Sequence, residues 1–225
     1  DWSSDVCSSD LERHEREIFP LLKRRRLFSG VADFLLYDLV SGDGSVNENV
    51  FAYTNGEGGE RALVAYNNAY AAASGRIRDS APYAEKLPGG GRRAARRSLA
   101  EALALRGGDR RFLAMRELRS GLWFLRRSAE VAGTGLALVL AGYECQVFLD
   151  LFELEDDARG TYAAVHDALA GRGTPDLAWA VQDVVLKDLY AALAALATPS
   201  YFGLAALAVR GPAAEAAGAA GPGAA

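Results

Sequence analysis

Apolar and aromatic residues gather in short runs over the first third of the chain, and turn-forming residues separate these runs. The runs cover residues 33–40, 49–54 and 61–67, and glycine-rich connections occupy 41–45 and 55–59. Runs rich in Val, Leu, Phe and Tyr are typical of strands, whereas clusters of Gly, Asn, Asp and Ser reverse the chain. The second connection also contains an Asn-Gly step, which is a hairpin signal. The pattern predicts an antiparallel meander.

The same pattern returns in the second half of the chain. Further strands are predicted at 111–118, 122–126, 135–140 and 143–153, and an Arg/Ala-rich stretch at 92–105 is predicted to be a helix. The sequence therefore predicts a mainly β chain, with an antiparallel β-sandwich-like domain, a short N-terminal helix and a C-terminal helical extension.

Helical spacing precedes the β region. Residues 12–28 are predicted to be helical, with Pro20 acceptable only as a first-turn residue of the stretch 21–28 and Gly30 as the stop. The segment carries a basic run at 23–26. We interpret this run as a solvated helix face or one docked on an acidic neighbour, and not as a nucleic-acid site, because no aromatic residues are interleaved with it.

Helical spacing also follows the β region. Thr161 is predicted to cap a helix over 162–170, and a second helix is predicted to open at Pro175 and to break at Pro199. Residues 189–209 contain no charged residue and approach the length of a membrane span. Because Pro199 interrupts this stretch, two short helices packed on the sheet domain are favoured over a membrane helix.

The two ends of the chain do not look like folded protein. Residues 1–11 resemble a standard sequencing-library adapter translated in frame, so we expect them to be non-native and the natural chain to begin upstream. The predicted organisation is a non-native segment at 1–11, a helix at 12–30 that ends a missing upstream domain, an antiparallel β domain at 31–157 with a helical insertion near 92–105, a helical extension at 158–209 and a disordered Ala/Gly/Pro tail at 210–225.

Charge and cysteine content narrow the functional classes. The formal net charge is −4, and segment 1–11 supplies acidic residues but no basic ones. The remainder is close to neutral, which indicates neither a nucleic-acid footprint nor an acidic tail. With Cys7 assigned to the non-native segment, Cys145 has no partner for an intrachain disulfide. The compartment is left open, with a slight preference for the cytoplasm.

The last predicted strand suggests a role for Cys145. Its alternation places these residues on one face: Tyr143, Cys145, Val147, Leu149 and Leu151. We expect Cys145 to face the core as a small hydrophobe, and we assign it no reactivity.

The residues needed for a catalytic centre do not gather in the sequence. The glycines at 89–91 have neither the spacing nor the flanks of a phosphate loop and are interpreted as a turn. His14 and His166 lie far apart in the sequence, so a shared metal is not predicted. Acidic residues cluster at the end of the last strand: Asp150, Glu153, Glu155, Asp156 and Asp157. We interpret them as solvated, with a calcium site as the weaker alternative. No catalytic, cofactor-binding or metal-ligating residue is predicted.

Several strand segments nevertheless resemble one family. The segments LLKRRRLFSGVADFLLYDLV, GSVNENVFAYTN and RALVAYNN, together with GYECQVFLDLFELED at 142–156, resemble the region that follows the catalytic barrel in bacterial proteins of the α-amylase-like glycoside hydrolase superfamily. The strand ending in Asn67 is similar to one that these proteins carry early in their C-terminal β domain. The strand at 143–148 is similar to the one with which that domain closes.

The resemblance implies a function for the whole parent protein and not a catalytic site here. Members of the family cleave or transfer α-glucosidic bonds with aspartate and glutamate residues of the barrel, and none of those motifs lies in this sequence. His166-Asp167 superficially resembles a barrel motif but is assigned no role. The implied task is to brace the missing catalytic barrel. Trp123 and Tyr143 are candidates for contact with an α-glucan, against the alternative that they belong to the core.

A second hypothesis comes from a different class. In it, the chain is a non-enzymatic protein-interaction module that uses the basic helix and the apolar C-terminal helices. Barrel motifs upstream of the sequence are expected under the first hypothesis and not under the second.

Overall fold

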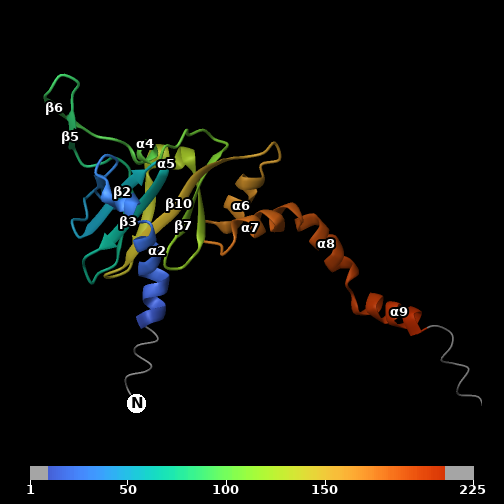
Figure 1. Ribbon diagram of the computed structural model, residues 1–225. Helices are drawn as coiled ribbons and strands as arrows, with labels where there is room; N and C mark the ends of the chain where they lie inside the picture. The colour runs from blue at the N-terminus through green and yellow to red at the C-terminus, as the bar shows by residue number, and fades with distance from the viewer. Residues whose placement is uncertain (1–9, 211–225) are drawn as a thin grey trace, which may run out of the picture. The chain divides into compact units, whose positions relative to one another are not determined.

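The computed structural model describes residues 10–210. They fall into two units, of which the first ends at Val181 and the second begins at Gln182, and each is described by itself. The first unit holds all the strands of the described residues (Figure 1).

The larger layer of the first unit is a six-stranded sheet in which every pairing is antiparallel. In spatial order its strands are β1 (Leu35–Tyr37), β2 (Val50–Glu57), β3 (Glu60–Asn67), β10 (Cys145–Glu155), β7 (Arg111–Glu117) and β8 (Trp123–Arg127). The long β2–β3 hairpin is in continuous register from Val50↔Asn67 to Glu57↔Glu60. Together with β1 it forms the predicted meander. The alternating residues of the hairpin and its Gly58-Gly59 turn favour a reversal there.

The smaller layer is a two-stranded antiparallel sheet of β4 (Ala73–Ile77) and β9 (Leu136–Leu140). Val40 extends it by one bridge, exchanging both backbone hydrogen bonds with Arg76 at 2.9 and 2.8 Å. The two layers form an antiparallel sandwich that is not closed, so the predicted fold class is confirmed.

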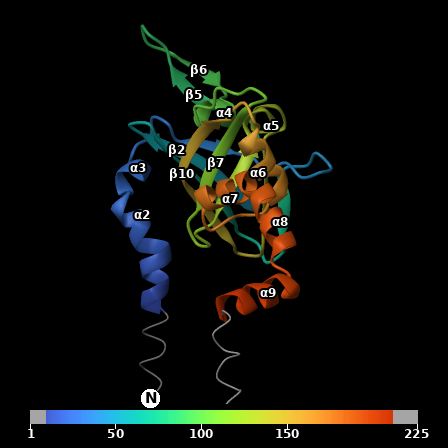
Figure 2. The ribbon, with the colours of Figure 1, turned by 90° about the vertical axis from the view of Figure 1, so that its right-hand side faces the viewer.

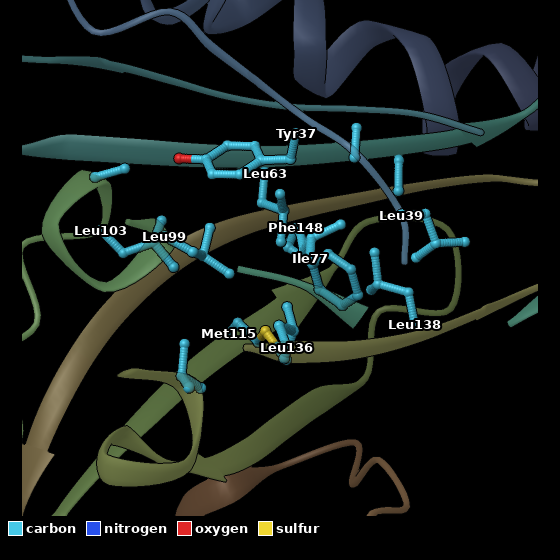
Figure 3. Close-up of a cluster of buried hydrophobic side chains, with 14 of the residues drawn as sticks. Tyr37, Leu39, Leu63, Ile77, Leu99, Leu103, Met115, Leu136, Leu138 and Phe148 are labelled. Carbon is cyan, nitrogen blue, oxygen red and sulfur yellow. The ribbon is translucent and has the colours of Figure 1, made fainter. Parts of the chain in front are cut away.

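The main core fills the space between the two layers, and Figure 3 shows its side chains converging there. Large members with almost no exposure are Leu39, Leu63, Ile77, Leu99, Leu113, Met115, Leu136 and Leu140. We call this cluster the inner core. It is the principal source of stability in this unit, because burial of apolar surface is the dominant favourable term in folding.

A helical segment covers part of the opposite face of the large sheet. It consists of η1 (His14–Ile18), α2 (Phe19–Lys23) and α3 (Arg25–Ser29), and α3 packs against β2 and β3 (Figure 2). Pro20 has no N–H to donate, and the turn before it widens, so that the Phe19 N–H bonds to the His14 carbonyl in π-helical fashion. The predicted N-terminal helix is thus confirmed, with an irregular turn at the proline.

The predicted helix at 92–105 is largely wrong. Residues Arg92–Ala95 form strand β6, which pairs with β5 (Tyr83–Lys86) in a hairpin that stands away from the two layers (Figure 1). The three glycines at 89–91 all have positive φ and make the turn, which L-residues with a Cβ adopt with difficulty. Only α4 (Leu99–Ala102) is helical. It starts where Ser98 and Glu101 form a reciprocal capping box.

One helix of the β region was not predicted. The segment α5 (Ser128–Thr134) follows β8 and ends at Gly135, whose φ is +83°. A Cβ at Gly135 would lie 2.3 Å from the Ile77 carbonyl oxygen. This close approach lets β9 begin directly beside β4.

The prediction that Cys145 faces the core is wrong, since this residue is exposed. Val147 and Leu149 do share a buried face, but it is the face under the N-terminal helix and not the inner core. A bulge between Leu149 and Phe152 then changes the side of the strand, so Leu151 packs against the inner core. Cys145 lies at the start of β10, where its side chain reaches solvent.

Helix α6 (Thr161–Leu169) was predicted in place, but its cap was not. Thr161 is its first residue, and the side chain of Asp156 accepts hydrogen bonds from the Tyr162 N–H at 2.7 Å and the Ala163 N–H at 3.2 Å. The Asp157 side chain accepts one from the Thr161 N–H at 3.1 Å. Two consecutive aspartates therefore satisfy the free donors of this helix end.

Three helices follow: α7 (Leu177–Val185), α8 (Lys187–Leu196) and α9 (Pro199–Arg210). In the described residues no single helix is long and apolar enough to cross a membrane, although α8 and α9 up to Val209 meet that test together with a 68° bend between them. The break falls at Pro199, as predicted. The predicted tail and most of the adapter-like segment lie outside the described residues.

Candidate interaction surface

An apolar surface lies beside the N-terminal helix, on the same face of the large sheet. Phe34, Leu36 and Phe51 are 40%, 47% and 53% exposed. They flank the half-buried Tyr53, whose ring centroid is 5.3 Å from that of Phe34. We call Phe34, Leu36 and Phe51 the outer patch.

The strand alternation explains why the outer patch is apolar. Leu36 is paired with Tyr53 in the register of β1 and β2, and Phe51 lies two residues before Tyr53, so these three side chains share the outer face. Val50 and Ala52 point the other way, into the inner core. A sheet with one solvated face usually alternates apolar and polar residues. Here both faces are apolar, which is typical of a sheet covered on both sides.

The helix covers the middle of this outer face. Leu27 is only 3% exposed and packs in one cluster with Ala62, Val64, Val147 and Leu149. The cover stops before β1, and the outer patch begins there. The sheet therefore has one complete inner face and an outer face that is partly covered.

The basic run is docked on acidic neighbours. Arg24 pairs with Asp150 at 2.6 Å, and Arg26 pairs with Glu57 at 2.9 Å. Both pairs are partly solvated, so each contributes little to stability. Both pairs agree with the docked orientation of the helix, in which Leu27 faces the sheet.

A shallow hollow of about 470 Å³ lies between this helix and the sheet, and Cys145 is at its wall. Partial desolvation raises the pKa of the Cys145 thiol, and the carboxylates of Glu117, Glu144 and Glu17 raise it further. A thiol with a raised pKa holds little thiolate near neutral pH and is a poor nucleophile.

The two residues predicted to contact glucan lie in different surroundings. Trp123 is half-buried, with its ring 5.7 Å from that of Phe152 in an edge-on arrangement and the Arg116 guanidinium 6.0 Å from its centroid. Tyr143 is 60% exposed and has a φ of 57°. Tyr143 lines the hollow beside the N-terminal helix, and Trp123 does not.

The acidic cluster is divided among separate structural tasks. Asp150 pairs with Arg24, Glu153 and Glu155 both pair with Arg111, and the two aspartates that follow cap α6. Within residues 10–210, no group of three His, Cys, Asp or Glu side chains is arranged to hold a metal ion.

The two histidines make separate local contacts. His14 Nδ1 is 2.7 Å from the Asp10 carbonyl oxygen, and His166 Nδ1 is 2.9 Å from Asp167 Oδ1. Each contact is made with a residue of the same helical segment, which is consistent with a structural role.

Comparison with known proteins identifies no relative, because no family model, no curated protein and no solved structure matches this chain. The resemblance to the α-amylase-like superfamily thus stays a prediction from the strand segments.

Proposed function

We propose that this chain is a non-catalytic β domain that braces the catalytic barrel of an α-glucan-acting glycoside hydrolase or transglycosylase, the barrel lying upstream in the parent protein. The observation that carries the proposal is the outer patch, an aromatic surface on a sheet face that is covered elsewhere by the N-terminal helix. A neighbouring domain would complete that cover.

An exposed apolar surface is unfavourable in water, and this free energy is the physical basis of the proposal. Burial of apolar surface contributes about 25 cal/mol per Å², and contiguous apolar patches on a monomer commonly mark interaction sites. Leu36 and Phe51 lie on the paired strands β1 and β2, and the ring of Phe34 lies against that of Tyr53, so the three form a fixed surface. A fixed apolar surface is suited to permanent contact with a rigid partner such as a barrel.

The helical segment indicates the side on which an upstream domain would meet the sheet. It packs along the same face as the outer patch, through Leu27, and the chain reaches the sheet through it. A domain that precedes this helix would therefore meet the sheet on the face that is incompletely covered. This arrangement supports an upstream partner within the same chain.

A second candidate, a protein-interaction module, draws on the other unit. There α8 and α9 carry exposed apolar residues, among them Leu193 at 53%, Leu196 at 60% and Leu204 at 70%. Amphipathic helices of this kind can bind in a groove of another protein. Arg24 and Arg26 are already paired within the first unit, so the basic run adds less to this candidate.

Sequencing outward from the codons for residues 22–67 in the source DNA tests the proposal directly. Barrel strands that carry an aspartate nucleophile and a glutamate acid upstream would support it, and a short upstream region without them would refute it. In the parent protein, Phe51→Asp should lower the melting temperature of the barrel and the β domain together. Val46→Asp, at another exposed apolar residue, is the matched control.

A further inference from the structure

Within residues 10–210, no strand pairs with one of the two backbone edges of strand β9. It has a single neighbour, β4, in a sheet of only two strands. Its side chains are Leu136, Ala137, Leu138, Val139 and Leu140, so no charged residue or proline protects the strand itself. Exposed apolar edges of this kind are templates for pairing with another strand.

Two independent contacts show which backbone groups point to the free edge. Arg76 exchanges both of its backbone bonds with Val40, so its N–H and C=O point away from its partner on β9, Ala137. Ala137 must then direct its own N–H and C=O away from β4. The second contact is a hydrogen bond at 2.9 Å that the Gln146 side-chain amide donates to the Val139 carbonyl, from the side opposite β4.

The space beside this edge is open. A hollow of about 480 Å³ lies between β9 and the inner face of β7, β8 and β10. Its apolar wall includes Met115, Phe124, Leu138 and Phe148. The opening marks the side on which the sandwich is not closed. An added strand would therefore meet the outward-facing backbone groups of Ala137 and Val139 and apolar side chains together.

We propose that β9 pairs antiparallel with β9 of a second copy of this chain, about a two-fold axis at Leu138. In that register Ala137 of each copy lies opposite Val139 of the other, and each such pair exchanges two backbone hydrogen bonds. The contact is isologous, because the same patch serves both copies. The two small sheets become one four-stranded sheet.

The side chains of β9 favour a second copy as the occupant. The small Ala137 faces the larger Val139, which is 69% exposed, so the outer side chains fit without a clash. No charge lies on the paired strands. Arg76 pairs with Glu130 at 3.0 Å, and Glu144, beside the free edge, accepts a hydrogen bond from the Ala141 N–H at 2.6 Å. The residues of the two paired strands therefore bring no like charges together.

Gln146 limits this association. Its amide donates to the Val139 carbonyl, and it is held by Glu144 Oε1 at 3.1 Å. The carbonyl that a second strand would use is thus already occupied by a side chain of the same molecule. The pairing is consequently weak and reversible, and removal of the amide strengthens it.

Sedimentation velocity on the whole 225-residue chain tests the proposal, at concentrations from about 1 μM to 1 mM, the range over which weak association is measurable. The wild-type chain should show a monomer–dimer equilibrium. Val139→Lys places one lysine per copy on the paired edge and should weaken the dimer roughly tenfold. Gln146→Ala should strengthen it. Val46→Lys, a matched change at another exposed valine, should leave it unaltered.

Hydrogen exchange supplies the second readout. The amides of Ala137 and Val139 should become more protected as the concentration rises, and those of Leu36 and Phe51 should not. A chain that stays monomeric, with exchange at 137 and 139 independent of concentration, overturns the proposal. So does a dimer that Phe51→Asp abolishes and Val139→Lys leaves intact, because that outcome would locate self-association at the outer patch.

Discussion

Truncation of Leu27 to alanine should destabilise the first unit by about 2–3 kcal/mol. Leu27 is 3% exposed and contacts apolar side chains from β3 and β10. Leu→Ala changes in well-packed interiors cost about 2–5 kcal/mol, and the lower end applies where the surroundings can collapse into the cavity. Here a short helix at the surface can move inward, so the lower end is expected.

Guanidinium unfolding, followed by tryptophan fluorescence and far-UV circular dichroism, measures this loss as a lower midpoint at unchanged slope. Leu22→Ala is the control, because Leu22 belongs to the same helical segment and is 59% exposed. It should change stability by less than about 0.5 kcal/mol. Equal midpoints for the two variants would refute the docked helix and, with it, the division of the outer face into a covered and an uncovered part.

Three further changes probe other parts of the first unit. Tyr37→Phe should cost about 1–2 kcal/mol, since it leaves the buried Thr54 hydroxyl, now 3.1 Å from the Tyr37 hydroxyl, without its partner. Burial raises the pKa of Tyr37 to about 12. The stability that its protonated hydroxyl contributes is therefore complete below about pH 10 and is lost as the pH rises toward 12. In the Tyr37→Phe variant, this part of the loss of stability at alkaline pH should be absent. Asp156→Ala should cost about 1–2 kcal/mol and speed amide exchange at the start of α6, where it now accepts two backbone hydrogen bonds; unchanged exchange there would contradict its capping role. Gly135→Ala should cost more than about 2 kcal/mol in thermal unfolding, because its φ is +83° and a Cβ would meet a backbone oxygen at 2.3 Å; a neutral effect would argue against the close approach of β4 and β9.

The sequence predicts the long strands because their signal is strong and local. In β2 and β3, period-two alternation is bounded by turn residues, and no competing pattern lies nearby. Strand β4 escaped prediction because Ser74, Gly75 and Arg76 dilute that signal. Its pairing with β9 depends on contacts across some sixty residues of chain, which local propensity does not register.

The error over 92–105 has a different physical origin. Alanine and arginine are strong helix formers, yet residues Arg92–Ala95 pair with β5 because the glycines at 89–91 turn the chain back on itself. The capping box at Ser98 and Glu101 was a readable signal for the short helix that does form. At this point the turn geometry outweighs the helix propensity of the residues.

The error over Cys145 shows the limit of alternation as a guide to burial. Alternation separates two faces of a strand, but it does not say which face meets the core when both are apolar. Val147 and Leu149 are buried by the N-terminal helix, whereas Cys145, on the same side of β10, is exposed. The extent of the covering helix decides the difference, and strand pattern carries no information about that extent.

The two uncovered surfaces of the first unit, the outer patch and the β9 edge, differ in the kind of partner that they can bind. The outer patch is made of side chains on a sheet face, so its partner needs shape and apolar area but no particular backbone direction. The β9 edge presents backbone donors and acceptors at fixed spacing, so its partner must be an extended strand in register. A charged residue at Phe51 should therefore disturb a domain contact and leave strand pairing intact, and a lysine at Val139 should do the reverse. Because the two surfaces depend on different chemistry, each can be disabled while the other is retained.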